Sequence, residues 1–158
     1  AALHGSAFGA GFQIAMGADI RYAAPNTRMS VMEIKWGLIP DMGITATMPG
    51  VLSEDRAKEL AFTGRVVEAD EAIALNLVTE LAADPLAKAT AVAKEIAGKS
   101  PDAIRSIKKM IGEAWRGNPA DMLALEAKLQ MAVMAGDNQQ EAAAANLEKR
   151  SPEFRDPP

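Results

Sequence analysis

Two acidic residues, Glu33 and Asp41, follow a glycine-rich segment, GSAFGAGF at positions 5–12, and together these could form one site. A carboxylate can move a proton as a general acid or base. Backbone N–H groups at a strand-to-helix turn with small side chains can hold a developing oxyanion. Two alternatives stay open: the glycines could serve close packing of a helix on a sheet, and Asp41 could cap a helix that opens within IPDMG at positions 39–43.

Three better-known uses of such a glycine-rich turn are excluded by the residues around it. No Gly-Lys-Ser or Gly-Lys-Thr follows, so the segment is not a phosphate-binding loop. Ile14 stands where a dinucleotide-binding fingerprint needs its third glycine. Ser6 lacks the Gly-x-Ser-x-Gly pattern of a nucleophile elbow. What remains is a turn whose free N–H groups point outward at the positive end of a helix.

The composition of the 158 residues excludes further classes of site. There is no cysteine, which excludes thiolate nucleophiles and zinc–cysteine sites, and the single histidine, His4, excludes a multi-histidine metal site, so we expect no metal. A formal charge of −4 without a basic stripe argues against nucleic acid as a partner. No apolar run approaches the ~18 residues of a membrane span. The opening AALHG reads like the end of a buried strand, so we expect further sequence upstream.

Short elements are expected before residue 50 and helices after it. The segments 19–24 and 28–31 predict strands around a PNT turn, and residues 9–18 predict a short buried helix before them. A strand, a helix and a strand in that order indicate a crossover in a mostly parallel sheet. Later helices are expected to start after four capping residues, of which the last three are each followed by proline: Ser53, Asp84, Ser100 and Asn118.

The predicted helix from Pro119 to about Ala135 carries apolar residues on two sides. One stripe consists of Met122, Leu125, Leu129 and Val133, and the other of Leu123, Ala127 and Met134. Such a helix needs two surfaces to cover it, so it lies either at the centre of the monomer or between subunits. We favour the subunit interface, because the chain is short and the helix comes late.

Two long segments, at positions 1–24 and 29–43, closely resemble the crotonase (enoyl-CoA hydratase/isomerase) superfamily. The second, MSVMEIKWGLIPDMG, matches the family's Pro/Val-x-Glu-x-x-x-Gly-x-x-Pro pattern, and the resemblance continues through positions 57–81 and the closing LEKRSPEF. It implies an α/β fold, a crotonase-like spiral of βαβ turns whose N-terminal part is missing. Residues 1–83 would form this partial spiral core with the active-site segment, and residues 84–158 a C-terminal helical region for trimerisation.

The resemblance assigns roles to four residues around the turn. The backbone N–H of Ala10 matches the second donor to the thioester carbonyl oxygen, and Glu33 matches the second of the two glutamates that hydratases of this family carry. Gln13 stands at the position of the first glutamate; it cannot exchange a proton, although it could orient a water or a substrate atom. Asp41 matches a carboxylate that dienoyl-CoA isomerases use as a second proton carrier.

The remaining residues have weaker assignments. Trp36 and Met42 could line the acyl pocket or belong to the core. Lys149 matches a position that can approach the CoA phosphates of a neighbouring subunit, or it could simply be solvated. His4 is expected at the end of a strand, without a role in proton transfer.

The function implied is an acyl-CoA enzyme of fatty-acid metabolism that stabilises a thioester enolate, with double-bond isomerisation ahead of hydration. The alternative is a non-catalytic or CoA-binding protein of this fold, since Gln13 replaces a catalytic acid. Coenzyme A would enter as part of the substrate, with no separate cofactor. A homotrimer or dimer of trimers in the cytoplasm is expected, with no nucleic-acid or membrane partner.

Overall fold

The structure, a computed structural model, describes residues 1–114, 117–134 and 136–156. The chain forms two compact units, Ala1–Ala91 and Val92–Pro158, which are described separately. The functional boundary expected between residues 83 and 84 stays a prediction. Ala135, where the late helix was expected to end, lies outside the described residues.

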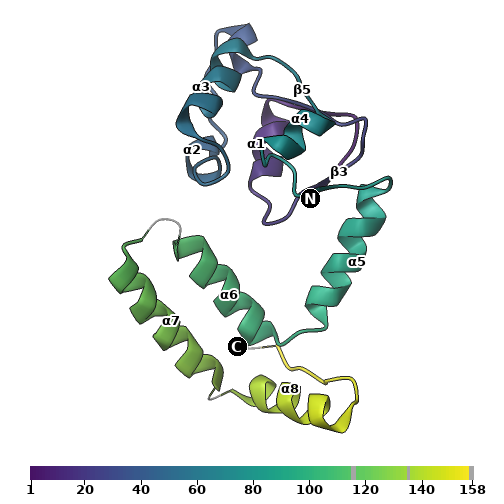
Figure 1. The fold of residues 1–158 in the computed structure, drawn as a ribbon, viewed down its shortest axis with the longest axis vertical. Helices are drawn as coiled ribbons and strands as arrows, with labels where there is room; N and C mark the ends of the chain where they lie inside the picture. The colour runs from purple at the N-terminus through teal and green to yellow at the C-terminus, as the bar shows by residue number, and fades with distance from the viewer. Residues whose placement is uncertain (115–116, 135, 157–158) are drawn as a thin grey trace. The chain divides into compact units, whose positions relative to one another are not determined.

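The first unit contains two small sheets, in which the chain repeatedly returns beside its earlier strands (Figure 1). Their strands are β1 (Ala2–Leu3), β3 (Tyr22–Ala23) and β6 (Glu80–Leu81) in one sheet, and β2 (Ser6–Phe8), β4 (Arg28–Ser30) and β5 (Val67–Glu68) in the other. β3 runs parallel to both β1 and β6, and β4 runs parallel to β2. Only the β4–β5 pair among the described strands is antiparallel. The mostly parallel crossover is therefore confirmed, and the predicted strands are confirmed over residues 22–23 and 28–30 of the expected 19–24 and 28–31.

Five helical segments lie wholly within the first unit: α1 (Ala10–Met16), the 3₁₀ helix η1 (Glu33–Trp36), α2 (Ile44–Thr47), α3 (Glu54–Thr63) and α4 (Ala69–Ala74). The short buried helix predicted over residues 9–18 is α1. Its Phe12 is fully buried and joins Met29 of β4, Leu60 of α3 and Leu77 in one apolar core. Burial of these large side chains fixes α1 against the strands and so fixes the turn before it.

The described residues after β6 form longer helices: α5 (Pro85–Ala97), α6 (Pro101–Ala114), α7 (Pro119–Met134) and α8 (Asp137–Glu148). The three predicted proline starts are confirmed. The Ala87 N–H donates to Asp84 Oδ1 over 2.9 Å, and the Asp121 N–H donates to Asn118 Oδ1 over 3.0 Å. Ser53 stands at the N-cap of α3, but its hydroxyl makes no capping bond and instead lowers the pKa of Asp55 by hydrogen bonding.

Helix α7 has one covered side and one exposed side. It lies beside α6 in the second unit (Figure 1), and its stripe of Met122, Leu125, Leu129 and Val133 is half-buried. The second stripe faces solvent: Leu123 is 66% exposed and Met134 58%. The exposed stripe is the surface that would enter a subunit interface, which stays a prediction.

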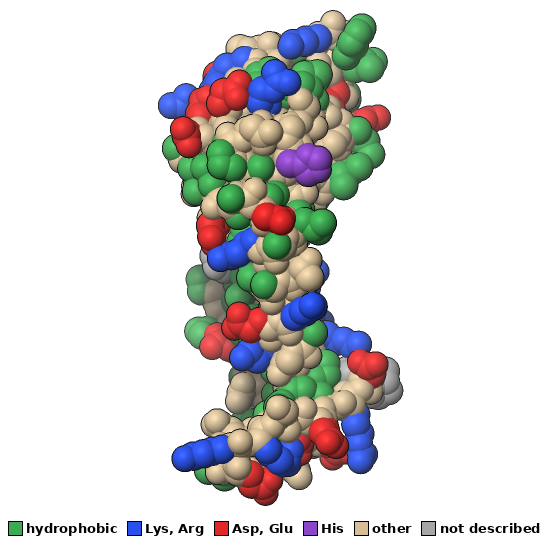
Figure 2. All heavy atoms as spheres, turned by 90° about the vertical axis from the view of Figure 1, so that its right-hand side faces the viewer, with side chains coloured by type: hydrophobic (Ala, Val, Ile, Leu, Met, Phe, Trp, Pro, Cys, Tyr) green, Lys and Arg blue, Asp and Glu red, His purple; other side chains and the backbone are tan. Residues whose placement is uncertain are grey.

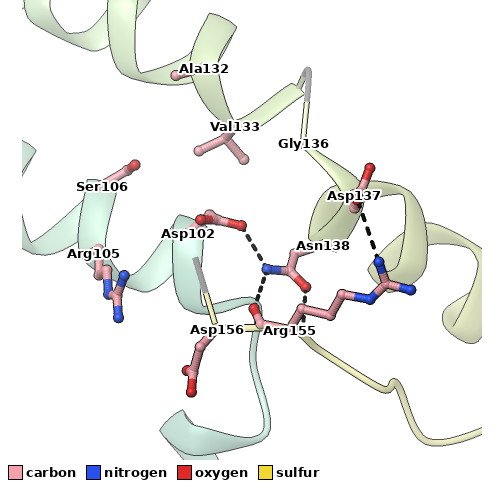
Figure 3. A pocket seen from close by; sticks show the side chains of 10 residues that line it. All are labelled: Asp102, Arg105, Ser106, Ala132, Val133, Gly136, Asp137, Asn138, Arg155 and Asp156. Atoms are coloured by element: carbon pink, nitrogen blue, oxygen red, sulfur yellow. Dashed lines mark hydrogen bonds and ion pairs between the residues drawn. The ribbon is translucent and has the colours of Figure 1, made fainter. Parts of the chain in front are cut away.

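Two side chains of α8 hold the segment that follows it. Asn138, which is buried, donates from Nδ2 to Asp102 Oδ2 and to the Arg155 carbonyl oxygen, and its Oδ1 accepts from the Arg155 N–H (Figure 3). Glu141 accepts from Arg150 Nη2 over 2.9 Å and from the Glu153 N–H over 2.7 Å. The closing segment, residues 149–156, is therefore held through its main chain at Glu153 and Arg155 and through the ion pair of Arg150 with Glu141.

The Tm of the protein is expected to decrease as the pH is lowered, and part of this decrease should depend on Glu141. Arg150 and then the Glu153 N–H lower the pKa of Glu141 from 4.5 to about 2. A carboxyl group with a depressed pKa stabilises the fold above its unfolded-state pKa, and this contribution is lost as the pH falls through the folded-state value. Between about pH 5 and pH 2, the Tm of the wild type should fall more than that of Glu141→Gln. Equal decreases would contradict this.

Basic and acidic side chains are interspersed over the face shown in Figure 2. No helix among the described residues has the length and apolar character needed to cross a bilayer.

Candidate active site

A pocket of about 370 Å³ opens in the first unit beside the start of α1. All six site residues that the sequence predicts in this unit line it: Ala10, Gln13, Glu33, Trp36, Asp41 and Met42. They come from α1, from η1 and from the loop between η1 and α2. Phe8, Gly9 and Met32 also line the pocket and were not predicted as site residues, although each directly precedes another lining residue in the sequence.

The turn before α1 is built around Gly9. Its φ of 53° and ψ of −118° suit glycine, because a side chain would be strained there. The Gly9 N–H donates to the Ser30 carbonyl oxygen over 2.9 Å, which ties the turn to the end of β4. Ala10 follows as the first residue of α1, so its N–H group has no acceptor within the helix. The residue is also exposed. Ala10 thus has the helical backbone that an oxyanion donor requires.

Close packing does not explain the glycines of this turn. A Cβ atom at Gly11 would meet nothing within 4 Å, so the packing alternative is wrong at that position. At Gly9 a Cβ atom would lie 3.5 Å from Glu33 Oε1, an ordinary contact distance. The turn therefore lies directly against the candidate base.

Gln13 and Glu33 form a hydrogen-bonded pair inside the pocket wall. Gln13 is only 2% exposed; its Nε2 donates to Glu33 Oε1 over 2.6 Å, and its Oε1 accepts from the Met42 N–H over 2.8 Å. The other carboxylate oxygen, Glu33 Oε2, is buried and has no hydrogen-bond partner among the described residues. A buried carboxylate oxygen without a partner is costly, so Oε2 is the oxygen of Glu33 that could accept a further hydrogen bond or a proton. Glu33 is therefore not a plain surface carboxylate.

The loop after η1 supplies the other predicted side chains. Asp41 is exposed and borders the pocket. Its alternative role as a helix cap is wrong: α2 begins at Ile44, its N-cap is Gly43, and no side chain caps it. Trp36 is 77% exposed and Met42 48%, so neither belongs to the core. Their contact with an acyl chain stays a prediction.

Two further residues named from the sequence are not among those that line this pocket. His4 is exposed directly after β1, as expected for a strand end. Lys149 belongs to the second unit, where it is the exposed C-cap residue of α8. Among the described residues, no group of three histidine, aspartate or glutamate side chains is placed to hold a metal ion.

Known proteins match both the sequence and the fold. A family model described as enoyl-CoA hydratase/isomerase matches residues 1–157. A probable enoyl-CoA hydratase, echA8 of Mycobacterium leprae, is 35% identical over 156 residues, which cover 98% of this chain and 61% of that protein. The chain therefore spans about three fifths of the length of this curated relative.

Two solved structures show the same architecture. The crystal structure of enoyl-CoA hydratase from Mycobacterium tuberculosis has a TM-score of 0.88 at 31% identity, covering 96% of this chain and 61% of the other. A putative enoyl-CoA hydratase from Thermobifida fusca, in complex with acetoacetyl-CoA, has a TM-score of 0.81 at 32% identity, covering 85% and 53%. With the spiral of short strands, these matches confirm the fold expected from the motifs: the chain belongs to the enoyl-CoA hydratase/isomerase family, the crotonase superfamily.

Proposed function

We propose that this chain forms part of an acyl-CoA enzyme of fatty-acid metabolism that moves a carbon–carbon double bond along the acyl chain. The observation that carries the proposal is the pair of Gln13 and Glu33. At the two positions where hydratases of the family carry glutamates, this chain has one carboxylate, Glu33, bonded to the neutral amide of Gln13. One carboxylate is sufficient for isomerisation, because the same group can remove a proton and return it.

The proton transfers balance with Glu33 alone. Its carboxylate removes a proton from carbon 2 of a 3-enoyl thioester, and the electron pair of that C–H bond forms a dienolate with its charge on the thioester oxygen. The N–H of Ala10 donates to this oxygen. Glu33 then returns the proton to carbon 4, the double bond lies between carbons 2 and 3, and the carboxylate is regenerated.

The other predicted residues fit around this reaction. Asp41 borders the same pocket, where it would serve as a second proton carrier for dienoyl substrates. Trp36 and Met42 would contact the acyl chain. Lys149 would approach the CoA phosphates of a neighbouring subunit in a homotrimer or dimer of trimers, with the exposed stripe of α7 at an interface.

A direct comparison of the two reactions tests the proposal. The purified protein is given a 3-enoyl-CoA, a dienoyl-CoA and crotonyl-CoA, and kcat/KM is measured for isomerisation and for hydration. Faster isomerisation is expected. The relatives named above are described as hydratases, and faster hydration by this protein would place it with them and overturn the proposal.

The second candidate is a binding protein that keeps the fold without catalysis. It is favoured by Gln13, which removes one of the two acids from the site. Tight binding of acetoacetyl-CoA together with no turnover on any of the three thioesters would establish this candidate instead.

A further inference from the structure

The orientation of the Gln13 amide is fixed by a main-chain donor. The Met42 N–H can only donate, so the end of the side chain that it meets must be the oxygen, at 2.8 Å. The nitrogen end then faces Glu33 Oε1 at 2.6 Å, where a carboxylate oxygen accepts. Because Gln13 is almost fully buried, a flipped amide would face a donor with a donor and an acceptor with an acceptor.

The two oxygens of Glu33 are consequently not equivalent. Oε1 is bonded to Gln13 and lies against Gly9, whereas Oε2 has no partner among the described residues. A carboxylate held by one oxygen presents the other in a fixed direction. Accurate placement of a base against its carbon is worth a large rate factor, since a displacement of about 1 Å can cost ~10²-fold.

Gln13 also joins this base to the loop that carries Asp41. Two glycines with left-handed backbones bound the loop, Gly37 with φ 68° and Gly43 with φ 84°. Between them the residues are mostly exposed, and the hydrogen bond from the Met42 N–H to Gln13 ties the loop to α1. One side chain thus sets the position of the loop and of the carboxylate together.

We infer that Gln13 is a positioning residue, which holds Glu33 by Oε1 so that Oε2 alone takes and returns the substrate proton. The inference rests on the proposed function for its chemistry. A glutamine suits this task better than the glutamate of hydratases, because it satisfies the Met42 N–H and the carboxylate at the same time without a proton of its own to exchange.

Replacing Gln13 by methionine tests the inference, because methionine has a similar length and forms neither bond. We expect kcat for isomerisation to fall by ~10²-fold while KM changes less than about threefold, because the substrate still binds but meets a misplaced base. With substrate deuterated at carbon 2, the isotope effect on kcat should be larger than in wild type. Gln140→Met makes the same change at an exposed position of α8 and should leave all three values unchanged. A purely structural role for Gln13 would lower Tm but leave kcat and the isotope effect of the folded protein unchanged, which would overturn the inference.

A second variant covers the case in which Gln13→Met fails to fold. Gln13→Glu keeps an acceptor for the Met42 N–H and places a carboxyl oxygen against Glu33 Oε1, where at neutral pH the two carboxyl groups share one proton and so keep a hydrogen bond. Once that proton is lost, the two carboxylates repel each other and Glu33 is no longer held by Oε1. Isomerisation by Gln13→Glu should therefore decrease relative to wild type as the pH rises, and a constant ratio of the two rates would overturn the inference.

A measurement without substrate separates this inference from the proposed function. The side-chain amide protons of Gln13 should exchange with solvent much more slowly than those of the exposed Gln140, as followed by NMR in the wild-type protein. Slow exchange in a protein that turns over no thioester would support the hydrogen bonding of Gln13 while the isomerase proposal fails. Equal exchange at the two glutamines would overturn the positioning role whatever the activity.

Discussion

Glu33→Gln is expected to lower kcat for isomerisation by ~10²–10⁴-fold, the range typical for loss of a general acid or base. Glutamine has the same shape as glutamate and keeps an oxygen that can accept from Gln13 Nε2, so the pocket wall should stay in place. Only the capacity to take up a proton is lost. The measurement is steady-state turnover of a 3-enoyl-CoA, with the affinity for acetoacetyl-CoA determined in parallel.

The matched control is Glu95→Gln, which makes the same change at an exposed position of α5. It should leave both turnover and affinity unchanged. If Glu33→Gln retained turnover within about threefold of wild type, Glu33 would not be the base, and the proposed reaction would have to be abandoned.

Ala10→Pro should lower kcat by ~10²–10³-fold, because proline removes a single N–H group from the proposed oxyanion site. Position 10 is the first of α1, where proline is well tolerated and no intrahelical bond is lost. The preceding Gly9 has the mirror image of an extended conformation, which a following proline accommodates. The free energy of unfolding should therefore change little, and this separates loss of the donor from loss of the fold.

Ala10→Ser serves as the control, since it alters the side chain and retains the N–H group. It should keep most of the wild-type turnover. A folded Ala10→Pro protein with wild-type kcat would show that this N–H group does not stabilise the enolate.

Much of the architecture was predictable because it depends on local signals. Proline directly after Asp84, Ser100 and Asn118 marks helix starts through the fixed φ of proline and the capping oxygen before it. The glycine-rich turn and the position of Glu33 belong to family motifs, so the residues lining the pocket could be named in advance. The two-sided character of α7 was visible in its sequence, but periodicity does not say which stripe the chain itself covers.

The details that decide the chemistry could not be predicted, because they depend on contacts across the fold. The bond from the Met42 N–H to Gln13 joins positions 29 residues apart and involves a main-chain group, which no residue type signals. The same loop explains why the prediction of Asp41 as a helix cap was wrong. There the local preference of aspartate for an N-cap is overridden by a chain that turns at Gly43 and starts α2 at Ile44.

The hydrogen bonds between Asn138 and the main chain of Arg155 have a consequence for sequence variation at these two positions. The amide of Asn138 hydrogen-bonds to the main-chain carbonyl and N–H of Arg155, and the ion pair of Arg155 with Asp137 is long and exposed. Position 155 should therefore drift freely among orthologues, with proline alone disfavoured because it lacks the N–H. Position 138 should tolerate almost no replacement, so in saturation mutagenesis the two ends of one interaction would show opposite mutational constraint.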